Sequence, residues 1–260
     1  MWTDAVRVAT DLAEVDWVRR RVTGPPGRVD GTVPTVYGAY ARILHPVGDG
    51  SDRSTTWAEV AQVTGRQVHP TVQWHALISA PDPYQRHAPL WRDMSPEVGN
   101  LSLEPLLALC DVLSRHTATP KDCLFALWEG WGWVRGGRAH VRFTADDGPG
   151  KPVPPAFTAA DLAAPRLHLP HRDYLVLRGP LSAMTQLVQC EGPDTWWTQS
   201  PSLFWPADRS WCVATEIDFD STLVGGSDAA IAGVLNHPLL EAWALDSHES
   251  LMAFADEINI

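Results

Sequence analysis

The chain has 260 residues, 45% of them hydrophobic, so it is long enough to bury a sizeable core, and its formal net charge is −11. This charge argues against nucleic acid and anionic membrane surfaces as partners, because both need clustered cations, whereas basic partners are easier to accommodate. No apolar run reaches the roughly eighteen residues of a membrane span, and the charged N-terminal segment does not resemble a signal peptide.

Helical periodicity and capping residues predict helices, in chain order, at residues 4–22, 56–65, 102–116, 180–188, 227–238 and 247–258. Alternating or continuous apolar runs predict strands at residues 35–44, 72–79, 123–129, 174–177 and 203–217. Thr56 and Glu59 have the spacing of a capping box, and Ser227 is a typical N-cap. The pattern predicts an α/β or α+β fold with a mixed β-sheet and flanking helices, in which the strand at 203–217 is central.

A loop rich in proline and glycine, residues 146–156, is the plausible internal boundary. We expect one globular domain over residues 1–260, with two lobes, 1–145 and 157–260, as the alternative. The four cysteines lack CxxC spacing and lie in apolar segments, which favours buried free thiols and a cytoplasmic location. They are Cys110, Cys123, Cys190 and Cys212.

Three carboxylates at the end of the predicted central strand form the strongest candidate site. Strand alternation from Trp211 onward would place Glu216, Asp218 and Asp220 together on one face, opposite an apolar face. Neighbours about 7 Å apart repel by roughly 2.4 kcal/mol at an effective dielectric near 20, so a partly buried set needs arginine, a metal ion or a raised pKa. The candidate arginine partners are Arg172, Arg178 and Arg209, and Mg²⁺ or Ca²⁺ is the alternative.

Tryptophan is over-represented, with 13 copies. One interpretation is a tryptophan-rich core between neighbouring strands. The other is an aromatic pocket beside the carboxylates, where indole faces and acids would suit a cationic or sugar-like ligand or a partner's arginine. The candidate pocket residues are Trp128, Trp131, Trp205 and Trp211.

A glycine step, Val224-Gly225-Gly226-Ser227, leads into the helix predicted after it. Gly225, Gly226 and Ser227 at a helix N-terminus are a candidate anion site. Asp228 and the nearby acids would oppose a phosphate there, so we favour Ser227 as a simple helix cap.

The stretch DFDSTL, residues 218–223, resembles the first motif of haloacid dehalogenase-like phosphatases. In that family the first Asp is the nucleophile, the second is the acid/base, and Mg²⁺ lies between them. The resemblance covers six residues and the preceding strand, and the family's later lysine has no counterpart because no lysine follows Thr222. We interpret the match as coincidental.

The chain as a whole resembles an uncharacterised protein family from high-GC actinobacteria without an assigned activity. The resemblance rests on ALWEGWGW, RGPL, WPADRSWCVATEID and VGGS. It implies a cytoplasmic protein and transfers no catalytic residue.

The functional expectation is a non-catalytic binding or regulatory protein. An acidic, tryptophan-flanked surface would hold a basic protein partner or a small cationic ligand, without a cofactor or a resident metal. The alternative is a metal-dependent hydrolase centred on Glu216, Asp218 and Asp220, for which calorimetry with Mg²⁺, Mn²⁺ and Ca²⁺ is the test.

Overall fold

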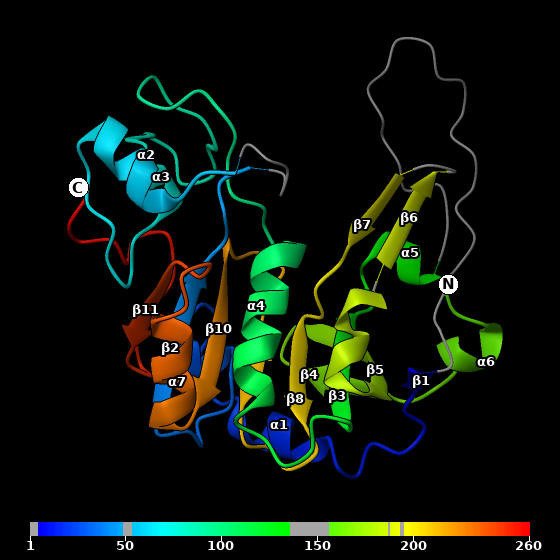
Figure 1. Ribbon diagram of the computed structural model, residues 1–260. Helices are drawn as coiled ribbons and strands as arrows, with labels where there is room; N and C mark the ends of the chain where they lie inside the picture. The colour runs from blue at the N-terminus through cyan, green and yellow to red at the C-terminus, as the bar shows by residue number, and fades with distance from the viewer. Residues whose placement is uncertain (1–4, 49–53, 136–155, 187, 193–194) are drawn as a thin grey trace.

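One antiparallel sheet forms the centre of the structure. The computed structural model describes residues 5–48, 54–135, 156–186, 188–192 and 195–260 (Figure 1). The strand order is β1-β5-β3-β8-β9-β10-β2-β11, with β4 beside β5. The strands are β1 (Arg7–Val8), β2 (Ala39–Leu44), β3 (Cys123–Trp128), β4 (Arg166–Leu169), β5 (Arg172–Gly179), β8 (Leu203–Pro206), β9 (Cys212–Ala214), β10 (Ser221–Gly226) and β11 (Ala242–Leu245). A separate hairpin pairs β6 (Val188–Gly192) with β7 (Thr195–Thr198).

Short helices cover the two faces of the sheet, which confirms the α+β class. The α-helices are α1 (Asp16–Arg21), α2 (Trp57–Thr64), α3 (Trp74–Leu77), α4 (Leu103–Ser114), α5 (Gly132–Arg135), α6 (Ala159–Leu162) and α7 (Asp228–Leu235). Two 3₁₀ helices, η1 (Val29–Gly31) and η2 (Leu181–Gln186), complete the described set.

Strands from both halves of the chain alternate in the sheet. β3 lies between β5 and β8, and β2 lies between β10 and β11. Described strands from residues 1–145 and from residues 157–260 therefore belong to one sheet. The proposed boundary loop falls outside the described residues, except for its last residue.

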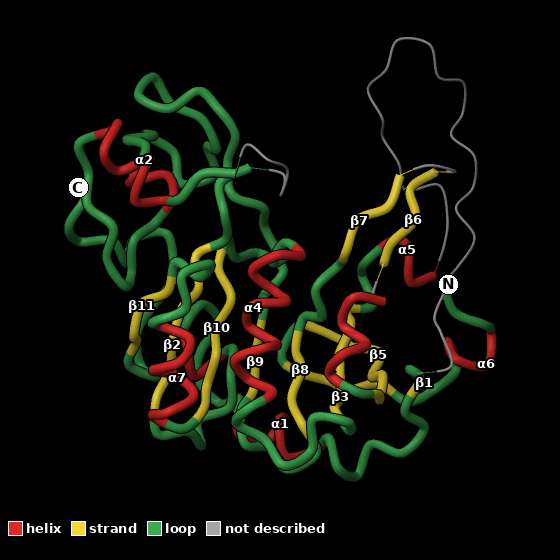
Figure 2. Tube along the Cα trace, in the orientation of Figure 1, coloured by secondary structure: helices red, strands yellow, loops and turns green. Residues whose placement is uncertain are grey.

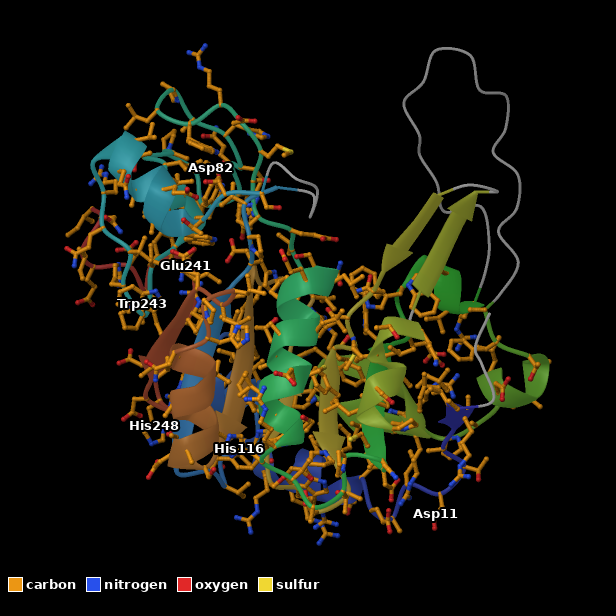
Figure 3. All side chains as sticks on the ribbon, viewed as in Figure 1. Asp11, Asp82, His116, Glu241, Trp243 and His248 are labelled. Carbon is orange, nitrogen blue, oxygen red and sulfur yellow. The ribbon has the colours of Figure 1, made fainter. Side chains whose placement is uncertain are left out.

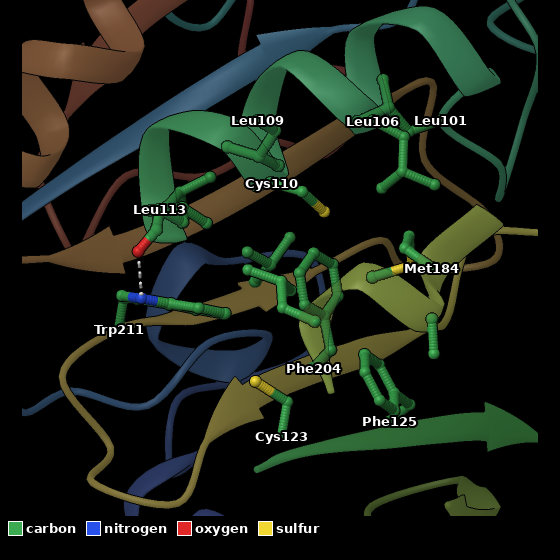
Figure 4. Close-up of a cluster of buried hydrophobic side chains, with 14 of the residues drawn as sticks. Leu101, Leu106, Leu109, Cys110, Leu113, Cys123, Phe125, Met184, Phe204 and Trp211 are labelled. Carbon is green, nitrogen blue, oxygen red and sulfur yellow. Dashed lines mark hydrogen bonds between the residues drawn. The ribbon is translucent and has the colours of Figure 1, made fainter. Parts of the chain in front are cut away.

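The larger hydrophobic cluster lies between the sheet and the helices α4 and α7. Leu106, Leu109 and Leu113 of α4 point onto the sheet (Figure 4). The rings of Phe125 in β3 and Phe204 in β8 stack there with centroids 6.3 Å apart. Each fully buried side chain of this size stabilises the fold by about 1.5–3 kcal/mol, so this layer fixes the helices on the sheet.

The opposite face of the sheet is covered by the N-terminal segment. Val18 of α1 and Val29 of η1 are buried there against Leu124 and Ala126 of β3 and against Leu251 from the C-terminal segment. Adjacent β3 residues thus enter opposite clusters. Burial on both faces explains the continuous apolar sequence of this strand.

A small lobe, residues 54–100, stands at one end of the sheet and carries α2 and α3 (Figure 1). The predicted capping box of α2 is present, and the helix ends at Gly65 in a left-handed conformation. Glu241, just before β11, accepts hydrogen bonds from the backbone N–H groups of Trp57 (2.7 Å) and Ala58 (2.8 Å) at the start of α2. Figure 3 shows Glu241 where the lobe meets the sheet, so this contact ties the two together.

Four predicted elements are wrong. Residues 4–22 contain β1, a loop and the short α1, because Val6 and Val8 pack with the cluster on one face of the sheet and Val15, Val18 and Val22 with the cluster on the other. Residues 72–79 contain α3, since an apolar run of this length fits either structure. The predicted strand 203–217 is the hairpin β8–β9 followed by a turn. Residues 247–258 contain no helix, and Figure 2 draws the segment after β11 as loop.

Close packing requires glycine at position 225 of β10 and leaves more room at Gly226. A methyl group on Gly225 would lie 2.5 Å from Cδ2 of Tyr37, whereas one on Gly226 would lie 3.3 Å from the Cβ of Ala230. We expect Gly225→Ala to lower the free energy of unfolding by about 1–3 kcal/mol, as overpacking does. Gly226→Ala, the matched control, should cost less than about 1 kcal/mol. Urea denaturation of both variants measures the difference, and equal costs would contradict the packing argument.

Candidate functional site

A cleft of about 750 Å³ lies where the sheet, the small lobe and both terminal segments meet. Its walls come from the segment 22–32, the small lobe, the turn between β4 and β5, the turn after β9 and residues 251–253. Glu216, Asp218 and Asp220 all line this cleft. The three carboxylates predicted from the sequence therefore lie in one cavity. They come together in a turn and not on one face of a strand.

The carboxylates lie in a turn, residues 216–220, which we call the acidic turn. The backbone N–H of Phe219 donates to the carbonyl of Glu216 at 3.0 Å, and Asp favours such turns over strands. Gly99 has a left-handed φ of +74° and donates its N–H to the carbonyl of Phe219 at 2.8 Å. A methyl group on Gly99 would lie 2.7 Å from the carbonyl oxygen of Ile217, so only glycine lets the small lobe hold the turn this closely.

Glu216 and Asp218 share one arginine. Nη2 of Arg172 donates to Oε1 of Glu216 at 3.1 Å and to Oδ2 of Asp218 at 2.7 Å. Burial raises the pKa of Glu216, and this effect outweighs the opposing influence of Arg172. The Asp218 side chain is 73% exposed, so its carboxylate is open to a ligand. The predicted pairing with Arg172 is confirmed.

Asp220 lies between two other arginines. Nη1 of Arg86 donates to Oδ2 of Asp220 at 3.1 Å, and Nη2 of the buried Arg42 lies 3.7 Å from Oδ1. Arg42 also donates to the Ser221 hydroxyl and to the carbonyls of Pro70 and Val72. Burial lowers the pKa of Arg42 to about 10, which leaves it charged at neutral pH. Asp220 is therefore the counter-charge of a buried arginine as well as a cleft residue.

The other predicted arginine partners have different roles. Arg178 forms ion pairs with Asp122 and Glu14, away from the cleft. The guanidinium of Arg209 lies over the ring of Trp17, 5.4 Å from its centroid.

None of the four candidate tryptophans lines the cleft, so they do not form the predicted aromatic pocket beside the carboxylates. Trp205 and Trp211 are fully buried in opposite clusters, and the indole N–H of Trp211 donates to the carbonyl of Leu113 at 3.0 Å (Figure 4). They are core residues, as the simpler interpretation held. Trp128 supports the site indirectly, since the guanidinium of Arg172 lies 5.7 Å from its ring centroid. Trp131 packs edge-to-face on Trp128.

The candidate anion residues do not form part of the cleft wall. Gly225 and Gly226 lie inside β10, paired with Tyr40 and Ala39 of β2. The hydroxyl of Ser227 accepts a hydrogen bond from the backbone N–H of Ala230 at 3.3 Å. Ser227 is thus the predicted N-cap of α7.

Arg42, Arg86 and Trp74 are site residues that sequence reasoning missed. The guanidinium of Arg86 lies 6.0 Å from the ring centroid of Trp74, and both side chains line the cleft. Arg42 is the one position with a visible signal, because it is a charged residue inside the apolar strand AYARIL. Such a residue needs a buried partner, but nothing local identifies Asp220.

The buried His45 supports the acidic turn through a hydrogen bond. The backbone N–H of His45 donates to the carbonyl of Asp220 at 3.0 Å, and its Nδ1 lies 2.7 Å from the carbonyl of Glu97. A carbonyl only accepts, so Nδ1 carries the proton and Nε2 accepts from the hydroxyl of Thr222 at 2.9 Å. Thr222 and Thr215 are linked at 2.8 Å. The network joins the small lobe to the sheet.

Protonation of His45 should weaken the fold at acid pH. Burial lowers the pKa of His45 to about 4 from 6.5. Between pH 6.5 and pH 4, protons bind the imidazole of the unfolded chain more readily than that of folded His45. The fold therefore keeps its full stability above pH 6.5 and loses roughly 3 kcal/mol as the pH falls to 4. In His45→Asn the amide N–H replaces Nδ1–H and does not titrate. We therefore expect its free energy of unfolding to fall less between pH 7 and pH 4.5 than that of the wild type. Urea midpoints at pH 7 and pH 4.5 measure it, and parallel declines in both proteins would contradict this assignment.

The described residues contain no group of three or more His, Cys, Asp or Glu side chains arranged to hold a metal ion. Guanidinium groups face the carboxylates of the acidic turn where a cation would bind. Within the same described part of the chain, no helix is long and apolar enough to cross a membrane.

Comparison with known proteins gave no match to a family model, to a curated protein or to a solved structure.

Proposed function

We propose that the chain is a non-catalytic binding protein and that the cleft holds a positively charged group of a ligand or of a basic partner. One observation carries the proposal: Asp218 lines the cleft with a largely exposed carboxylate, beside Glu216, and the two share a single arginine. One guanidinium leaves this pair with a formal charge of −1. An incoming ammonium or guanidinium group would supply the missing positive charge.

The proposal includes a cytoplasmic location and excludes nucleic acid and membranes as partners. The net charge of −11 supports this exclusion. The free, buried thiols of Cys110, Cys123 and Cys212 support a reducing compartment.

The alternative, a metal-dependent hydrolase centred on the acidic turn, has less support because the arginines already neutralise much of its charge. Calorimetry with Mg²⁺, Mn²⁺ and Ca²⁺ separates the two ideas. Binding of a divalent cation that Asp218→Asn abolishes would favour the hydrolase.

The test of the proposed function uses a pool of dipeptide amides, which carry positive charge and no carboxylate. At millimolar concentration they should shift the backbone NMR signals of the acidic turn and of Arg172. We expect Asp218→Lys to abolish these shifts by reversing the charge of the cleft wall.

The matched control is Asp111→Lys on α4. Asp111 is also exposed, at 60% of its side chain, also pairs with one arginine, Arg115, and lies outside the cleft. This variant should bind as the wild type does. Absence of any shift in the acidic turn, or equal loss in both variants, would contradict the proposed function.

A further inference from the structure

The cleft carries two charge centres of opposite sign. Around Asp220 there are two arginines for one carboxylate, which gives a formal charge of +1. Around Arg172 there are two carboxylates for one arginine, which gives a formal charge of −1. Charged groups of one cleft wall are therefore separated into a positive and a negative end.

The positive centre offers its charge through Arg86. Arg42 is buried, and its Nε and Nη1 already donate to Ser221, Pro70 and Val72. The Arg86 side chain is 29% exposed and is held by the carbonyl of Pro96 at 2.6 Å and by the ring of Trp74. A guanidinium fixed in this way is a preorganised donor for an oxyanion.

Both centres depend on one short turn. Glu216 and Phe219 begin and end a hydrogen-bonded turn, in which the first and fourth Cα atoms lie within about 7 Å, and Asp220 follows directly. The ring of Phe219 lines the cleft within this turn. Both centres therefore open into one cavity, whose volume falls in the range of about 300–1,000 Å³ typical of small-molecule sites.

We propose that the natural ligand is a zwitterion of amino-acid or short-peptide type, an inference that rests on the proposed function. Its oxyanion faces Arg86 and its ammonium or guanidinium group faces Asp218 and Glu216. The exposed side chains of Tyr84 and Met252 at the rim supply apolar contact to its uncharged part.

The experiment compares one dipeptide pool in three forms. The free form is a zwitterion, the C-terminal amide keeps only the positive end, and the N-acetyl form keeps only the negative end. Dipeptides with uncharged side chains make this comparison clean. NMR titration of the full chain should show that the free form binds about tenfold more tightly than either blocked form, as one charge-assisted hydrogen bond would give.

Two variants assign the ends. Arg86→Gln should make the free form bind no better than the amide, and Asp218→Asn should make it bind no better than the N-acetyl form. Arg178→Gln is the control for the first variant. Arg178 is exposed to a similar extent, at 28% of its side chain, but its ion pair lies outside the cleft. Arg86→Lys, which keeps the charge, should retain part of the preference, and thermal unfolding checks that each variant is folded.

The outcomes separate the two proposals. If the amide binds as tightly as the free form, the zwitterion inference is wrong and the proposed function stands. If the N-acetyl form binds as tightly as the free form, or if no form shifts the acidic turn, both are wrong.

Discussion

Replacing Asp220 with alanine is expected to lower the free energy of unfolding by about 3–5 kcal/mol. The change leaves the buried guanidinium of Arg42 without its counter-charge, and breaking a buried pair from one side has a cost of this size. This expectation rests on the position of the Asp220 carboxylate between the guanidinium groups of Arg42 and Arg86. Urea denaturation at neutral pH measures the loss.

Asp218→Ala is the matched comparison, because it removes a carboxylate of the same turn. Its side chain is largely exposed, so its ion pair should contribute no more than about 1 kcal/mol. The double variant Asp220→Ala with Arg42→Met should be more stable than the sum of the single costs predicts. Equal destabilisation by Asp218→Ala and Asp220→Ala would contradict the division into a binding carboxylate and a structural one.

Replacing Asp256 with alanine is expected to cost about 3–5 kcal/mol as well, by releasing the C-terminal segment. The buried Asp256 carboxylate accepts hydrogen bonds from Nε2 of His69 (2.8 Å), the backbone N–H of Gln73 (3.1 Å) and both N–H donors of Asn259 (2.9 Å each). Burial alone would raise the pKa of Asp256, but these hydrogen bonds outweigh it and hold the pKa below its usual range. Alanine leaves several buried donors without a partner.

This second prediction also concerns the cleft, since residues 251–253 line it. Hydrogen exchange in Asp256→Ala should therefore accelerate at Gln73 and Asn259, and dipeptide binding should weaken. Glu257→Ala is the control, because Glu257 is the exposed neighbour and its loss should change stability by no more than about 0.5 kcal/mol. If both variants have wild-type stability, the hydrogen bonds of Asp256 do not hold the C-terminal segment.

The elements that could be predicted from the sequence have local causes. The capping box of Thr56 and Glu59 and the cap at Ser227 act within a few residues of the helices that they begin. The failures have tertiary causes. The spacing of valines in residues 4–22 fits a helix, but they pack on opposite faces of the sheet, so the segment is largely irregular.

The candidate site was only partly visible in the sequence for the same reason. Three acids within five residues must lie near one another in any fold, so their grouping could be predicted. Their arginine partner could be narrowed only to three candidates, of which Arg172 pairs with the acidic turn. Arg42 and Arg86 reach Asp220 from more than a hundred residues upstream, and no periodicity encodes that approach. Without these two arginines the predicted site was purely acidic, whereas the structure has one positive and one negative charge centre in the cleft.

The central claim is that the acidic turn forms one wall of a binding cleft with separated charges. The most direct measurement is a crystal structure of the chain with the tightest-binding free dipeptide. We expect the carboxylate of the dipeptide to lie against the guanidinium of Arg86 and its ammonium group to lie against Asp218. A dipeptide bound outside the cleft, or bound in it with its ends reversed, would contradict the claim.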